Sequence, residues 1–305
     1  MIPRAYRILF IFSLILPSLS FGADTTFLRL SPKVVENRLE QLNVVVDQRP
    51  AALKKAFQEA GCPAAQIAEQ TVPGNPLTTV MCTIRGSEPG AIVVAAALDY
   101  RSSGEELAVD TATLELLPLL VQSLGKGNHR QTMVFVGFTG AKKQEGSKYF
   151  LAQMSNEERK NIRGMIFLDH LGRSPMRYLH PSQWNEPGVS RLQGRDRGDL
   201  GNLDDNASHD PTPLNKWLDD ASMAMKLNYP RELKEFYFTH AISFEHKGID
   251  ALTLTSPAYV LLEHQRAQLG VLKMPATTLT LPTYYESYSL ICLYMMKLDA
   301  NLQGK

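Results

Sequence analysis

The stretch Ala91–Asp110, AIVVAAALDYRSSGEELAVD, decides the fold class of this chain. Its first seven residues are six Ala or Val and one Ile, a pattern typical of a strand covered on both faces, as parallel strands in α/β sheets are. Ligands of such sheets bind just beyond the carboxyl ends of the strands. We therefore expect Asp99 and the loop that leads to Asp110 to lie at a functional site.

Similar apolar runs, separated by segments with helical spacing, recur along the chain. Strands are expected at 78–85, 132–138, 164–169, near 235–239 and at 250–255, and helices at 32–46, 50–60, 110–124, 147–154, 214–227 and 284–302. This alternation predicts an α/β fold, a three-layer sandwich with a central, mostly parallel sheet flanked by helices. Residues 23–305 are expected to form one domain, with an inserted flap at about 181–213, where Gly, Asp, Asn and Pro are frequent.

The charge balance excludes two classes of partner. The 305 residues carry 32 Lys and Arg against 31 Asp and Glu, a net charge of +1. No global field favours nucleic acid or an anionic membrane surface, so neither is expected as a partner. Any binding must depend on a local site.

Residues 1–22 have the pattern of a secretory signal peptide. Arg4 and Arg7 precede an apolar run from Ile8 to Leu19, and small residues around Gly22 offer a cleavage site. The alternative is an uncleaved membrane anchor, but the run is shorter than the roughly 20 residues that span a bilayer. We expect an exported protein, periplasmic or secreted, with no membrane segment after cleavage.

Export places the three cysteines in an oxidising compartment, where an odd number implies one pair and one single thiol. Cys62 follows a predicted helix and Cys82 lies in a predicted strand a short distance further along the chain. We expect these two to form a disulfide. Cys292 lies in an apolar helical pattern, where a free cysteine behaves as a small hydrophobic residue.

Several spaced segments together resemble one known family. IVVAAALDY, TMVFVGFTGAKKQEGSKYF and MIFLDHLG, in this order, resemble the exported co-catalytic zinc aminopeptidases of metallopeptidase family twenty-eight, which also includes glutaminyl cyclases and the peptidase-like domain of the transferrin receptor. The resemblance implies two zinc ions bridged by a carboxylate and a water that a Glu deprotonates. It places Asp99 at the residue that orients a zinc ligand, Asp110 at the bridging carboxylate and Asp169 at a further ligand.

The same resemblance indicates a degenerate active site. Ala97 stands where the family has a zinc-binding His, Ala141 at its general base, Lys142 at a zinc-binding Glu and Gly270 at its last His ligand. A methyl group cannot accept a proton, and a charged ammonium cannot bind zinc. The resemblance thus leaves two of the five zinc ligands, so no cofactor is expected. It also places His240 in the substrate pocket.

Lys142 and Lys143 suggest how the remaining carboxylates are neutralised. Asp110 and Asp169 would repel one another without a cation. We expect the ammonium of Lys142 or Lys143 to lie within ion-pair distance of one of them. An exposed pair of loop lysines is the alternative.

Three classes of function remain open. The first is a pseudo-peptidase that keeps its cleft as a binding module for a peptide, a glycan or an envelope protein. The second is an active metallo-aminopeptidase that hydrolyses peptide N-termini at a rebuilt metal site, for which the candidate ligands are Glu145, His170, His240, His246 and His264. The third is a structural partner that uses its surface. The zinc content of the purified protein separates the second class from the other two.

Overall fold

The computed structural model describes residues 27–39, 45–100, 105–180, 212–227, 232, 239–256 and 279–302. The expected signal peptide, nearly all of the expected flap and Gly270 lie outside these residues. So do His264 and most of the strand expected near 235–239.

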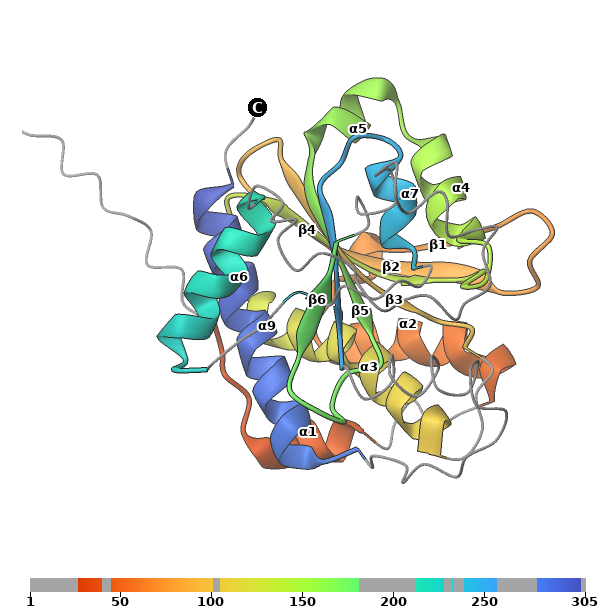
Figure 1. Cartoon of the computed structure of the whole chain (residues 1–305). Helices are drawn as coiled ribbons and strands as arrows, with labels where there is room; N and C mark the ends of the chain where they lie inside the picture. The colour runs from red at the N-terminus through yellow and green to blue at the C-terminus, as the bar shows by residue number, and fades with distance from the viewer. Residues whose placement is uncertain are drawn as a thin grey trace, which may run out of the picture.

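A seven-stranded sheet forms the middle layer of the described chain (Figure 1). Its order is β1-β2-β4-β3-β5-β7-β6, and the central strands β4, β3, β5 and β7 run parallel. The pairs β1–β2, β2–β4 and β6–β7 are antiparallel. The α/β prediction is confirmed, and the sheet is mixed because antiparallel pairs extend both edges. The strands are β1 Ile67–Thr71, β2 Thr78–Ile84, β3 Ala91–Ala97, β4 Thr132–Phe138, β5 Ile162–Asp169, β6 Arg177–Leu179 and β7 Ala251–Thr255.

Helices cover both faces of the sheet (Figure 1). Side chains of β3 alternate between two cores: Ile92, Val94 and Ala96 belong to the larger one, and Val93, Ala95 and Ala97 to the smaller. The larger core contains side chains of α1 Pro32–Arg38, α2 Arg49–Glu59, α3 Glu105–Leu124, α6 Pro213–Ala224 and α9 Leu281–Asn301. The smaller contains side chains of α4 Glu145–Gln153 and α7 Ala241–Glu245, while the short α5 Asn156–Asn161 leads into β5.

Several predicted helix boundaries change in the structure. The helix expected at 32–46 ends at Arg38, and a 3₁₀ turn, Val46–Gln48, leads into α2. Helix α3 begins at Glu105, so Asp110 lies inside the helix and not at its start. The edge strands β1 and β6 were not expected, because each is short and neither shows a continuous apolar pattern.

The disulfide expected from the cysteine pattern is confirmed. Cys62, just after α2, is bonded to Cys82 of β2, and Cys292 is a buried free thiol in α9. This bond joins α2 to the β1–β2 edge of the sheet. Among the described helices, none is long and apolar enough to cross a membrane.

Candidate functional site

A buried histidine, His170, lies between two carboxylates at the carboxyl end of β5. Its Nδ1 is 2.7 Å from Oδ1 of Asp169, and its Nε2 is 2.9 Å from Oδ1 of Asp110. The three side chains are at most 2% exposed. Asp110 and Asp169 are the two acidic residues that the resemblance places at zinc ligands, and the structure brings them to opposite sides of one imidazole ring.

The backbone at His170 explains how its side chain reaches this position. Neighbouring residues of a strand point to opposite faces, but His170 has a φ of 46°, a left-handed conformation that is uncommon for residues other than glycine. The next residue, Leu171, donates its N–H to Oγ1 of Thr113 in α3 at 2.9 Å. The turn after β5 is thereby held against the helix that carries Asp110.

The charges around His170 favour its protonated form. Burial alone would lower the pKa of His170, but the negative charge of Asp169 and the hydrogen bonds to Asp110 and Asp169 outweigh it and raise the pKa to about 9. The Tyr100 hydroxyl donates a further hydrogen bond to Oδ1 of Asp169 at 2.8 Å, and its ring lies 4.9 Å from that of His170. With this raised pKa, the imidazole between Asp110 and Asp169 carries its proton at neutral pH.

A second buried cation, Arg49, lies beside this cluster. Its Nη1 donates to the backbone carbonyls of Leu98 at 3.2 Å and Tyr100 at 3.0 Å, on either side of Asp99. Burial lowers the pKa of Arg49, and the charges of Asp110 and Asp99 oppose that shift. The sequence did not indicate this role for Arg49, at the start of α2, because an arginine in a helix is usually exposed.

Asp99 holds the loop that follows β4. Its carboxylate accepts the N–H of Gly140 at 2.7 Å and that of Ala141 at 3.2 Å. Gly140 has a φ of 74°, and a Cβ there would lie 2.6 Å from Cβ of Glu145, so this turn requires glycine. Asp99 thus positions the loop in which the resemblance places the general base.

The expectation for Lys142 and Lys143 was wrong. Both are exposed, and the cation that lies between Asp110 and Asp169 is His170. The reason is geometric: the Asp99-capped turn directs the loop after β4 outward, while the left-handed turn after β5 directs an imidazole inward.

The other candidate zinc ligands that the structure describes have other surroundings. Glu145 accepts a hydrogen bond from the side chain of Asn75 at 3.3 Å, and His246 is exposed at the end of α7. His240 is fully buried; its Nδ1 lies 2.8 Å from Oγ of Ser147, and its ring contacts Phe138 and Phe167. Burial lowers the pKa of His240 to about 3, so this ring stays neutral.

A second histidine between two carboxylates lies at the other end of the sheet. His180, directly after β6, has its Nδ1 3.2 Å from Oε1 of Glu245 and its Nε2 3.4 Å from Oδ1 of Asp250. Burial would lower the pKa of His180, but hydrogen bonds to Asp250 and Glu245 raise it to about 9. The sequence did not single out this group.

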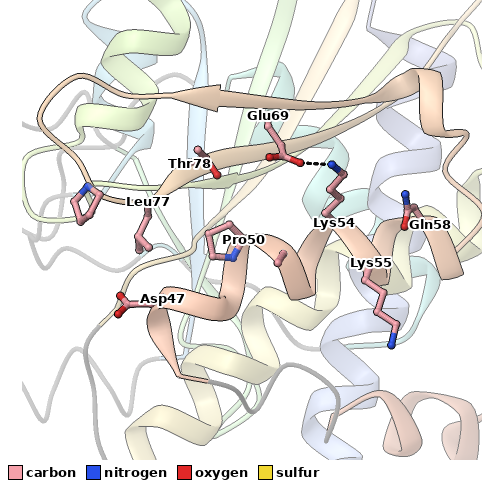
Figure 2. Close-up of a pocket in the computed structure, with 10 residues that line it drawn as sticks. Asp47, Pro50, Lys54, Lys55, Gln58, Glu69, Leu77 and Thr78 are labelled. Carbon is pink, nitrogen blue, oxygen red and sulfur yellow. Dashed lines mark ion pairs between the residues drawn. The ribbon is translucent and has the colours of Figure 1, made fainter.

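An open groove of about 400 Å³ lies between α2 and the β1–β2 edge (Figure 2). Its wall is partly apolar, with Pro50 and Leu77, and an ion pair between Lys54 and Glu69 crosses one side. None of the residues that line it belongs to either histidine cluster.

No protein-family model and no curated protein matches the chain, whereas many solved structures do. LapA aminopeptidase of Legionella pneumophila is similar, with a TM-score of 0.59 and 12% identity over 90% of this chain and 73% of that chain. A glutaminyl cyclase of an Acidobacteriales bacterium has a TM-score of 0.61 and 13% identity over 91% of this chain and 97% of that chain. The fold is aminopeptidase-like.

The zinc aminopeptidase BSAP of Bacillus subtilis is also similar, with a TM-score of 0.50 and 12% identity over 72% of this chain. This chain covers 49% of BSAP, about half of its length. Identities this low establish the aminopeptidase-like fold and leave the activity to be argued from the residues of the site.

Proposed function

We propose that this chain is an exported aminopeptidase-like protein that has lost the metal centre and acts as a binding module for a peptide or an envelope protein. One observation carries the proposal: the imidazole of His170 lies between Asp110 and Asp169, the two positions that the resemblance assigns to zinc ligands. A protonated imidazole there supplies the positive charge that a metal would otherwise supply.

The residues at this place do not fit a pair of zinc ions. Among the described residues, Asp110, Asp169 and His170 do not form a set of three donor atoms that lie within 4.8 Å of one another, so their donor atoms do not converge on one point. Zinc ligands have to converge within about 2.0–2.3 Å of the ion. The remaining positions that the resemblance assigns, Ala97, Ala141 and the exposed Lys142, offer no donor side chain.

The alternative, an active metallo-aminopeptidase with a rebuilt site, finds little support among the described residues. Glu145 and His240 have other partners, Asn75 and Ser147. Among the described residues, neither joins Asp110 or Asp169 in a group of three donor atoms that could hold a metal ion.

Export is supported by two features. Residues 1–22 have the signal-peptide pattern, and the Cys62–Cys82 disulfide suits an oxidising compartment.

The proposal is tested with mature protein assayed against a panel of aminoacyl p-nitroanilides and peptides with N-terminal glutamine, with added zinc and with a chelator. A zinc aminopeptidase serves as positive control. We expect turnover equal to the buffer blank in every condition. Hydrolysis that the chelator abolishes, and that Asp110→Asn also abolishes, would overturn the proposal.

The binding half is tested by selection of a displayed peptide library on the immobilised mature protein. We expect enriched peptides whose binding is lost in Tyr100→Ala, at the edge of the His170 cluster, and kept in Lys55→Ala, in the groove of Figure 2. Loss of peptide binding in Lys55→Ala alone would place the binding site in the groove and away from the His170 cluster. A library without enriched peptides would contradict the role as a binding module.

A further inference from the structure

The second histidine cluster has the arrangement of a metal site. We propose that His180, Glu245 and Asp250 bind one divalent transition-metal ion. Their three donor atoms all lie within 4.8 Å of one another, and in the described part of the chain no other three His, Cys, Asp or Glu side chains meet this condition. This site is separate from the one discussed under the proposed function.

Three elements bring these residues together. His180 follows the edge strand β6, Glu245 ends α7, and Asp250 directly precedes β7. Because β6 runs antiparallel to β7, with Leu179 opposite Thr253, the end of β6 lies beside the start of β7. The cluster is therefore at the amino ends of the parallel strands, whereas Asp169 ends β5 at their carboxyl ends.

The distances need only a small adjustment to hold an ion. Bonds of about 2.0–2.2 Å to nitrogen and oxygen place the donor atoms of a tetrahedral zinc site about 3.3–3.6 Å apart. The Nδ1 of His180 lies 3.2 Å from Oε1 of Glu245, and its other ring nitrogen, Nε2, lies 3.4 Å from Oδ1 of Asp250. One donor atom from each residue already lies within 4.8 Å of the other two, so metal binding requires the two carboxylates to turn toward a single ring nitrogen.

The charge and the exposure of the cluster also suit a cation. No lysine or arginine of the described residues forms an ion pair with Glu245 or Asp250. The two carboxylates are 13% and 19% exposed, while His180 is 6% exposed. An ion therefore has a route from solvent, and water can complete its coordination.

The donor set indicates the class of metal. One imidazole with two carboxylates suits zinc, iron, manganese or cobalt, whereas calcium and magnesium prefer oxygen ligands alone. A bound ion would join the end of β6 to α7 and β7, three segments that are far apart in the sequence.

The test is a zinc titration of the mature protein at pH 8 after removal of metals, with a chromophoric chelator as competitor. This pH is chosen because a proton on His180 competes with the metal. We expect one zinc per chain and a loss of affinity of at least tenfold in His180→Gln. The matched control is His129→Gln, because His129 pairs with a single carboxylate, Asp299. The control should keep its zinc.

Absence of zinc binding in the wild type, or full affinity in His180→Gln, would overturn the proposal. Crystals equilibrated with zinc and measured at the zinc absorption edge keep the test decisive even where His180→Gln does not fold. An anomalous peak among His180, Glu245 and Asp250 supports this inference. A peak between Asp110 and Asp169 contradicts the proposed function, whereas the absence of a peak among His180, Glu245 and Asp250 contradicts this inference, so the two failures are distinguishable.

Discussion

Two histidines of this protein lie between two carboxylates each, at opposite ends of one sheet. His170 is buried between Asp110 and Asp169, at distances of 2.9 and 2.7 Å. Its side chain is almost fully shielded from solvent. His180 has longer contacts, and its partners Glu245 and Asp250 reach solvent. The same residue types thus form a closed ion pair at one end and an accessible set of ligands at the other. Burial and the length of the contacts, and not composition, distinguish the two.

The largest expected effect comes from removal of each histidine in turn. His170→Ala leaves two buried carboxylates without their imidazolium and should lower the free energy of unfolding by ~3–5 kcal/mol. His180→Ala should cost less, ~1 kcal/mol, because water can solvate its carboxylates. Urea denaturation at pH 7 measures both. Addition of Asp110→Asn to His170→Ala should recover part of the lost stability. Equal losses of stability in His170→Ala and His180→Ala would contradict the distinction between a buried and a solvent-accessible cluster.

The next effect is a dependence of stability on pH. The pKa of each histidine is raised from 6.5 to about 9 in the folded protein, so between these values the folded state binds more protons than the unfolded state. The free energy of unfolding should therefore fall as pH rises from 6.5 to 9, by up to ~3 kcal/mol for His170 and by less for His180, whose carboxylate partners reach solvent. Urea denaturation across this range should show a shallower slope in His170→Gln. If stability falls with pH as steeply in His170→Gln as in the wild type, His170 is not an imidazolium in the folded protein.

Zinc should act on one cluster and not on the other. At a free concentration one hundred times its dissociation constant, zinc should raise the free energy of unfolding by ~2.7 kcal/mol. His180→Gln should lose this gain, and His129→Gln should keep it. Thermal denaturation with and without zinc measures the effect, and a gain that survives in His180→Gln would assign the ion to another site.

The smallest expected effect tests the partners of the buried cluster. Tyr100→Phe removes the hydrogen bond to Asp169 and should cost ~1 kcal/mol. The loss should be additive with His180→Gln, because the two clusters share no residue. Urea denaturation of both single variants and of the double variant checks this, and a clear departure from additivity would mean that the clusters are coupled.

The sequence predicted the parts of the fold that have a strong local pattern. The apolar runs of β3, β4 and β5 and the pair Cys62–Cys82 were predicted correctly, because burial on both faces and cysteine spacing are visible in the residues themselves. The start of α3 was placed five residues late. That helix begins with Glu105 and Glu106 after the polar residues 101–104, so its first turn continues the loop in composition.

The cation of the buried cluster could not be predicted in the same way. His170 follows Asp169 in a strand pattern, which would place the two side chains on opposite faces. The positive φ that turns His170 back between the carboxylates has no signature in the sequence, since glycine is the residue that usually marks it. The choice of Lys142 and Lys143 relied on charge alone and was wrong.

The His180 cluster was missed for a different reason. His180 lies 65 positions before Glu245 in the numbering, and the edge strand β6 that His180 follows has only three residues. Tertiary structure alone places these side chains together. Because β6 was not expected, a search for histidines that adjoin predicted strands would not have found His180 either.

The most direct test of the account is nuclear magnetic resonance of the mature protein labelled with ¹⁵N in its histidine rings, at pH 7.5 and with saturating zinc. The account predicts that His170 keeps both ring nitrogens protonated in the presence of zinc, while the signals of His180 change to those of a metal-bound ring. A neutral or zinc-bound His170 would contradict the central claim that an imidazolium, and not a metal, lies between Asp110 and Asp169.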